Sequence, residues 1–141
     1  LHVQGEDGMS ITLEQYFQAK QHTETHTEAA NDLLDRVDRL CTALAWDWPI
    51  CPNTGSSVSG SKGGSGDGGF RLQTATTGAA TSSHKEARAV DVYDPKNELD
   101  ELITDQLLMA YGLYREAPDA TPGWSHLTTR TPKSGRRTFV P

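Results

Sequence analysis

Apolar residues recur at the 3.6-residue period of an α-helix between residues 27 and 45. The positions that fall on the shared face are Ala30, Leu33, Leu34, Val37, Leu40, Cys41 and Leu44. The charged residues of the same stretch fall on the opposite face, where water would solvate them. This pattern predicts an amphipathic helix that packs one side against a hydrophobic core.

Two shorter helices are predicted from the signals at their ends. Thr12 and Gln15 have the spacing of a capping box and indicate a helix over residues 12–19. A second helix would begin at an asparagine cap, cover residues 97–111 and end at Gly112, a residue that commonly terminates helices. Both helices would bury their apolar residues against the same core as the long helix.

Three short segments show the alternation typical of β-strands. Residues 89–93 are apolar and β-branched around Asp91, and residues 124–127 follow a Pro-Gly turn signal. Residues 46–50 alternate in the same way and predict a strand that enters the same sheet. The order strand, helix, strand predicts an α+β fold with a small antiparallel sheet, which carries polar residues on one face and helices on the other.

The composition of the chain predicts one flexible loop and disfavours several classes of function. Residues 55–69 are dominated by glycine and serine and predict a flexible loop inside one domain that spans residues 1–141. The formal net charge of −6 disfavours nucleic acid as a partner. No apolar run approaches the roughly 18 residues of a membrane span, and the first residues lack the pattern of an export signal. A basic cluster is interpreted as a solvated tail and consists of Arg130, Lys133, Arg136 and Arg137.

The cysteines and two of the histidines are given structural interpretations. Cys41 and Cys51 are too few for a disulfide scaffold, so Cys41 is predicted to be a buried free thiol, with a Cys41–Cys51 bridge as the alternative. His22 and His26 have the spacing of a helical metal-binding pair, but no third ligand is in register with them. They are therefore predicted to lie on a solvated loop.

His84, Asp91 and His126 form the candidate site. Asp91 lies within an apolar strand, where an unpaired carboxylate is costly and a cation is the simplest partner. Two histidines and one carboxylate are a ligand set that Zn²⁺ accepts when one coordination position stays open for water. The alternative is that Asp91 forms an ordinary salt bridge and that both histidines are partly buried side chains without a metal.

The motifs around these residues resemble a known family. Ser82-x-His84 is followed by Ala89-x-Asp91, and Trp124-x-His126 comes later in the chain. This order resembles the zinc D-alanyl-D-alanine carboxypeptidase family, which includes the vancomycin-resistance D,D-dipeptidases and the phage L-alanyl-D-glutamate peptidases. The closing run over residues 124–137 is similar to a phage-encoded branch of that family. The similarity covers nearly the whole chain.

The resemblance implies roles for individual residues. His84, Asp91 and His126 match the positions of the zinc ligands, and Ser82 matches the serine of the motif. Arg71, in Gly-Phe-Arg, matches the arginine that binds substrate and stabilises the oxyanion. The resemblance also implies the fold of that family, with helices behind a small sheet.

The chain departs from the family pattern at two positions. Ala87 replaces the usual glycine three residues after the first histidine, and Gly123 replaces the catalytic glutamate three residues before the second. Asp119 and Glu116 are the nearest acids upstream of Gly123, and Asp119 is the favoured general base because it is closer in sequence to the second histidine. Its alternative role is to cap the turn that follows Pro118.

The function that the resemblance implies is zinc-dependent hydrolysis of a D,D- or L,D-bond in peptidoglycan stem peptides. Such a phage-encoded enzyme would act in the virion or in the host cytoplasm or periplasm. The alternative is a non-catalytic protein of the same fold, either a virion structural protein with other virion proteins as partners or a cell-wall-binding protein. This protein would keep zinc for stability.

Overall fold

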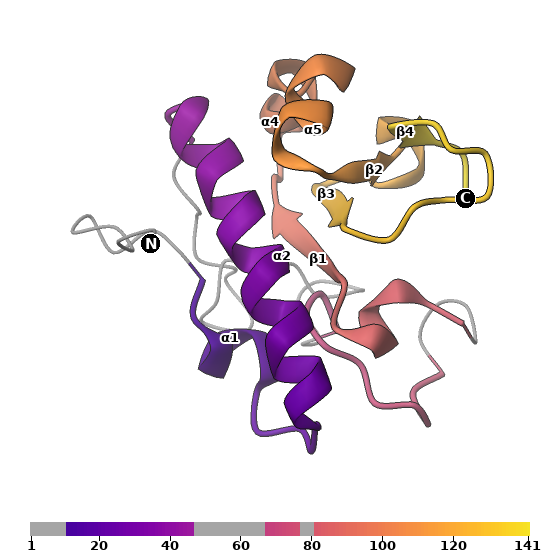
Figure 1. The fold of residues 1–141 in the computed structure, drawn as a ribbon. Helices are drawn as coiled ribbons and strands as arrows, with labels where there is room; N and C mark the ends of the chain where they lie inside the picture. Colours follow the sequence, from indigo (N-terminus) through magenta and orange to yellow (C-terminus); the bar gives the residue numbers. More distant parts are fainter. Residues whose placement is uncertain (1–10, 47–66, 77–80) are drawn as a thin grey trace.

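The computed structural model describes residues 11–46, 67–76 and 81–141 (Figure 1). Helices and strands follow one another as α1 (Leu13–Phe17), α2 (Glu24–Ala43), η1 (Ser83–Glu86), β1 (Ala89–Tyr93), α4 (Glu98–Leu102), α5 (Asp105–Tyr111), β2 (Tyr114–Glu116), η2 (Pro118–Ala120), β3 (Trp124–Thr128) and β4 (Thr138–Phe139). The predicted α+β class is confirmed. No helix among the described residues has the length and apolar character that crossing a membrane requires.

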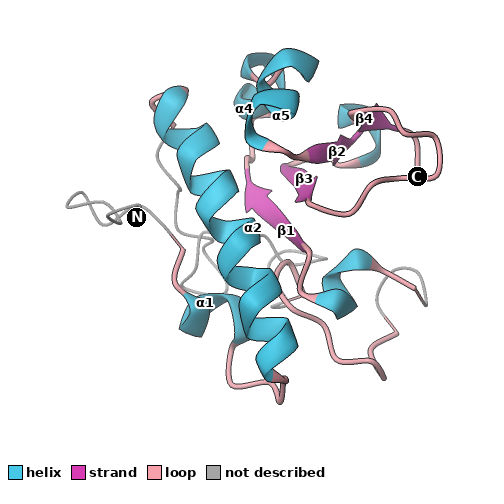
Figure 2. Cartoon of the chain, in the orientation of Figure 1, coloured by secondary structure: helices cyan, strands magenta, loops and turns pink. Residues whose placement is uncertain are grey.

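The sheet contains four strands in the order β1-β3-β2-β4. β3 pairs antiparallel with both β1 and β2, and β4 adds to β2 in the parallel direction. The predicted small antiparallel sheet is present in β1, β3 and β2, and β4 makes the sheet mixed because the chain loops over residues 129–137 and returns alongside β2. Figure 2 shows the sheet on one side of the molecule and the long helix α2 beside β1.

The hydrophobic core lies between α2 and the sheet. The predicted apolar face of α2 is buried apart from Leu44, which caps the helix and is partly buried. Val90 and Val92 of β1 are buried on the same side, because alternate strand residues point to the same face of the sheet. α1 closes one end of this layer, and the buried Tyr16 hydroxyl donates a 2.7 Å hydrogen bond to the Ala89 carbonyl. The long helix thus supports the strand that carries Asp91.

The long helix begins earlier than the periodicity predicts. Thr23 is its N-cap, and the Thr23 hydroxyl accepts from His26 N while the His26 ring accepts from Thr23 N. A histidine in place of the usual glutamate or glutamine completes the capping box, which explains why the sequence did not reveal it. His26 therefore lies in a helix rather than on the predicted loop, and His22 stacks on Phe17 with ring centroids 3.6 Å apart.

The predicted helix over residues 97–111 is two helices. Ile103 is extended, and Thr104 caps α5 by accepting a hydrogen bond from Leu107 N. Asn97 makes no side-chain cap for α4; the Asp94 carboxylate accepts the first N–H groups of that helix instead. The predicted end at Gly112 is confirmed, since this residue has φ +68°.

The structure also bears on the predictions for the cysteines and for the segment that follows α2. Cys41 is a buried free thiol, and burial raises the pKa of its thiol; Cys51 lies outside the described residues. Trp46 follows the last turn of α2, and its backbone N–H donates to the Cys41 carbonyl. The rest of the predicted strand over residues 46–50 lies outside the described residues. Ala87 has a φ of +58°, in the left-handed region that favours glycine.

The end of the predicted Gly/Ser loop is packed rather than flexible. Residues 55–66 lie outside the described residues, but Gly68 and Gly69 are buried. The Gly68 carbonyl accepts from Asp91 N at 2.8 Å, and the Gly69 carbonyl accepts from the His84 ring at 2.8 Å. Gly68 therefore bonds to β1 at Asp91 and Gly69 bonds to the ring of His84, so deletion through residue 69 would disturb the site.

Gly69→Ala should destabilise the fold. A Cβ at this position would lie 2.5 Å from the Tyr16 carbonyl oxygen, so the backbone of one segment must move. We expect a loss of about 1–3 kcal/mol in the free energy of unfolding, as for other overpacked interiors, measured by urea denaturation. Gly135→Ala is the control. A Cβ added at Gly135 would have no atom within 4 Å, so only the φ of +72° at this residue opposes a side chain. Equal stability of Gly69→Ala and wild type would contradict the packing described.

Candidate metal centre

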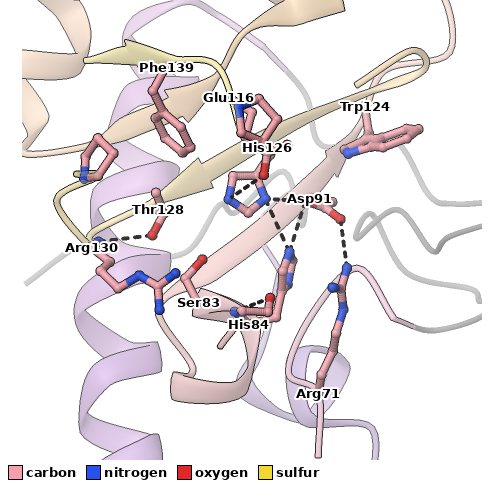
Figure 3. Close-up of a pocket in the computed structure, with 13 residues that line it drawn as sticks. Arg71, Ser83, His84, Asp91, Glu116, Trp124, His126, Thr128, Arg130 and Phe139 are labelled. Carbon is pink, nitrogen blue, oxygen red and sulfur yellow. Dashed lines mark hydrogen bonds and ion pairs between the residues drawn. The ribbon is translucent and has the colours of Figure 1, made fainter. Parts of the chain in front are cut away.

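Two paired strands and a short helix bring the three predicted ligands together. Asp91 on β1 stands directly opposite His126 on β3 in the strand register. His84 comes from η1, which precedes β1 and ends in the left-handed conformation of Ala87. All three side chains are buried (Figure 3). The fold therefore assembles a ligand set from positions that lie 42 residues apart in the chain.

The donor atoms of the three side chains converge. His84 Nε2 lies 3.3 Å from His126 Nδ1 and 3.3 Å from Asp91 Oδ1, and His126 Nδ1 lies 3.0 Å from the same oxygen. Metal–ligand bonds of about 2.1 Å in tetrahedral geometry separate neighbouring ligands by roughly 3.4 Å. The observed separations are close to that value, so the group can hold a metal ion.

Backbone contacts orient His84. Its Nδ1–H donates to the Gly69 carbonyl at 2.8 Å, which leaves the lone pair on Nε2 facing Asp91 and His126. The Ser82 hydroxyl accepts from His84 N at 3.2 Å and caps the short helix. Ser82 thus positions the first ligand through the backbone, and it also lines the cavity described below.

Electrostatics favour the ligand forms of these groups. Burial lowers the pKa of His84, so its imidazole is neutral near pH 7 and keeps a free lone pair. Burial alone would raise the pKa of Asp91, but interactions with His84 and His126 outweigh it and hold this pKa below the usual range. A neutral imidazole and an ionised carboxylate are the forms that bind divalent cations.

A cavity of about 460 Å³ opens over the three ligands, a size typical of small-molecule and peptide sites. Its lining is formed by Arg71, Ser82, Ser83, His84, Asp91, Glu116, Trp124, His126, Thr128, Arg130, Pro132, Phe139 and Pro141. Figure 3 shows that the labelled side chains come from η1, the sheet strands, the segment before η1 and the loop after β3. Three protein ligands would leave a coordination position that faces this cavity.

Arg71, the arginine to which the resemblance gives a substrate-binding role, lines the same cavity. Its side chain is buried, and its guanidinium Nη2 lies 3.7 Å from Asp91 Oδ2. Nε–H of Arg71 donates to the Asp67 carbonyl at 2.7 Å, and its backbone N–H donates to the His84 carbonyl. These contacts fix a positive charge beside the ligands, within the cavity lining.

The structure favours Glu116 over Asp119 as the general base, whereas the sequence favoured Asp119. Glu116 lines the cavity, and its Oε2 lies 3.4 Å from His126 Nε2, on the ring edge opposite the ligand atom Nδ1. Asp119 is exposed on η2 and is not part of the cavity lining. β2 brings Glu116 close because its register pairs Arg115 with Leu127, the neighbour of His126. Glu116 is therefore the better candidate.

Gly123 has a conformation that suits glycine. Its φ is +92°, and its N–H donates to the Asn97 side chain at 2.9 Å. A glutamate at this position would be strained whatever space surrounds it. The backbone conformation at Gly123 therefore opposes the glutamate that the resemblance implies at this position.

Arg130 is a cavity residue that the sequence did not reveal. The basic cluster was interpreted as a solvated tail, but Arg130 Nη1 donates to the Thr81 carbonyl at 2.7 Å and lies 3.1 Å from Glu86 Oε1. Arg137 likewise stacks over the Tyr114 ring at 4.2 Å. The one available signal was that Arg130 follows the second ligand by only four positions.

Comparisons of the chain with protein-family models, curated proteins and solved structures found no match.

Proposed function

We propose that this protein is a zinc-dependent peptidase of the zinc D-alanyl-D-alanine carboxypeptidase family that hydrolyses peptidoglycan stem peptides. The observation that carries the proposal is the buried group of His84, Asp91 and His126 beneath a cavity that also contains Arg71. This is the ligand set and the arginine that the sequence motifs of the family imply. A phage-encoded protein that acts on the host cell wall fits these motifs.

Each side chain has a chemical role in this proposal. A zinc ion bound to the three ligands would polarise the scissile carbonyl and lower the pKa of water toward ~7. Arg71 is placed to bind the substrate carboxylate or the oxyanion through charge-assisted hydrogen bonds. Glu116 would accept a proton from the attacking water and deliver it to the amine as the C–N bond breaks. The products are a shorter stem peptide with a new carboxylate and either a free amino acid or a second peptide with a new amine.

A second candidate function is favoured by one observation. Gly123 occupies the position of the family's catalytic glutamate, and its φ of +92° disfavours any other residue. If Glu116 only orients His126, the protein would bind metal and the stem peptide without efficient turnover. It would then serve as a virion structural or wall-binding protein with other virion proteins as partners.

Hydrolysis of purified muropeptides distinguishes the two functions. We expect the zinc-loaded protein to release a shorter stem peptide that mass spectrometry identifies, and we expect a chelator to abolish turnover until zinc is restored. The mass of the product also reveals which bond is cleaved. Zinc-loaded protein that binds muropeptides without cleaving them would support the non-catalytic function, and activity that survives complete zinc removal would contradict the metal assignment.

A further inference from the structure

The cavity carries two guanidinium groups on opposite sides of His84. Figure 3 shows Arg71 on one side of this histidine and Arg130 on the other, with the side chain of Arg130 extending toward Ser83. We propose that Arg130 binds a second carboxylate of the substrate, on the acyl side of the scissile bond. This inference rests on the proposed function, in which Arg71 binds the carboxylate of the departing residue.

Arg130 has donors available for this contact. Its backbone N–H donates to the Thr128 hydroxyl at 3.0 Å, which fixes the start of the side chain beside the end of β3. Its contacts with Thr81 and Glu86 both use Nη1. Across the described ranges, Nε and Nη2 of Arg130 make no hydrogen bond, so one edge of the guanidinium can bind a carboxylate with two parallel N–H···O bonds.

The contact with Glu86 does not prevent this role. The side chain of Arg130 is 37% exposed and that of Glu86 is 48% exposed, and ion pairs between solvated groups are weak. The hydrogen bond to the Thr81 carbonyl keeps the guanidinium in place whether or not Glu86 is charged. Arg130 is therefore positioned by the backbone and does not depend on the carboxylate of Glu86.

The charge of the cavity favours an anionic peptide. The described cavity lining contains two acidic residues, Asp91 and Glu116, and two basic residues, Arg71 and Arg130. A divalent cation on the ligands would make this lining positive within a chain whose formal net charge is −6. A positive cavity in an acidic protein concentrates anionic ligands and disfavours cationic ones.

This arrangement selects one chemical class of stem peptide. A stem that ends in D-Ala-D-Ala has its terminal carboxylate on the departing residue. Its third residue lies on the acyl side and is either lysine, with a cationic side chain, or diaminopimelate, which has an additional carboxylate on the carbon that carries the side-chain amine. Arg130 would attract that added carboxylate and repel the lysine ammonium. We infer that diaminopimelate-type stems are the preferred substrate.

The test uses two synthetic pentapeptides, L-Ala-γ-D-Glu-X-D-Ala-D-Ala, in which X is meso-diaminopimelate or L-lysine. For wild type we expect kcat/KM to favour the diaminopimelate peptide by about tenfold, the size of one charge-assisted hydrogen bond. Arg130→Gln should bring the ratio near one, mainly by raising KM for that peptide. Arg136→Gln removes an equal charge from an exposed residue outside the cavity and should keep the wild-type ratio.

Calorimetry with metal-free protein gives a second measurement that does not require turnover. The diaminopimelate peptide should bind about tenfold more tightly than the lysine peptide to wild type, and equally to Arg130→Gln. If Arg130→Gln does not fold, Arg130→Lys keeps the charge without the planar fork and should show a smaller preference than wild type.

The outcomes separate the two proposals. Hydrolysis of both peptides by wild type with the same ratio in Arg130→Gln would overturn the role of Arg130 and leave the peptidase function intact. Zinc-loaded wild type that hydrolyses neither peptide would overturn the peptidase function, and the calorimetric preference would then decide the role of Arg130. Equal binding of both peptides to wild type would overturn that role.

Discussion

Zinc should raise the free energy of unfolding of the wild-type protein by about 4 kcal/mol at a free concentration 1,000 times its Kd, and Asp91→Asn should lose most of this gain. The asparagine side chain has the same shape but no charge, and a neutral amide is a poor zinc ligand. We expect zinc affinity to fall by more than about 100-fold, since changes outside the ligand set alone cost 10- to 100-fold.

Thermal unfolding with and without zinc measures this effect, and the metal content after dialysis confirms it. Asp119→Asn is the matched control, because it makes the same chemical change on an exposed residue outside the cavity. It should keep the full stabilisation by zinc. An Asp91→Asn variant that binds and responds to zinc like wild type would show that His84 and His126 do not act together with this carboxylate.

Glu116→Gln should lower the turnover of muropeptides by about 10²- to 10⁴-fold, the usual contribution of a positioned general base. Among the described acids that line the cavity, Glu116 is the one that does not belong to the ligand group. The glutamine keeps the size of the side chain and removes its ability to accept a proton. Initial rates with zinc-loaded protein measure the change.

The zinc affinity of the same variant distinguishes the base from an orienting residue. Oε2 of Glu116 lies 3.4 Å from Nε2 of His126, so the carboxylate is also placed to orient this ligand. If orientation is its only role, zinc binding should weaken by about 10- to 100-fold, and turnover at saturating zinc should recover. Unchanged turnover and unchanged affinity in Glu116→Gln would exclude both roles.

The parts of the fold that the sequence predicted are those with a local signal. The long helix has apolar residues at a regular period, and the strand around Asp91 is a short apolar, β-branched run with one acid at its centre. The break at Ile103 was missed because Leu99, Leu102, Leu107 and Ala110 also fit a single continuous helix. Thr104 was the available signal, since threonine is a common N-cap.

The parts of the site that the sequence did not predict depend on long-range pairing. β2 has only three residues, too few for a periodic pattern, and its register with β3 is what brings Glu116 to the ring of His126. Sequence distance therefore favoured Asp119, whereas the strand register favours Glu116. Arg130 was missed for the same reason, because its contact with the Thr81 carbonyl joins segments 49 residues apart.

The parallel strand β4 has a consequence for self-association. An exposed β-strand edge can pair with an edge on another copy and start aggregation. On the outer edge of β2, Arg115 N–H donates to the Arg137 carbonyl, and Ala117 N–H donates to the Phe139 carbonyl. The returning segment therefore occupies the donors that a second copy would need. Since Phe139 also lines the cavity, the strand that covers the edge of β2 also forms part of the cavity wall.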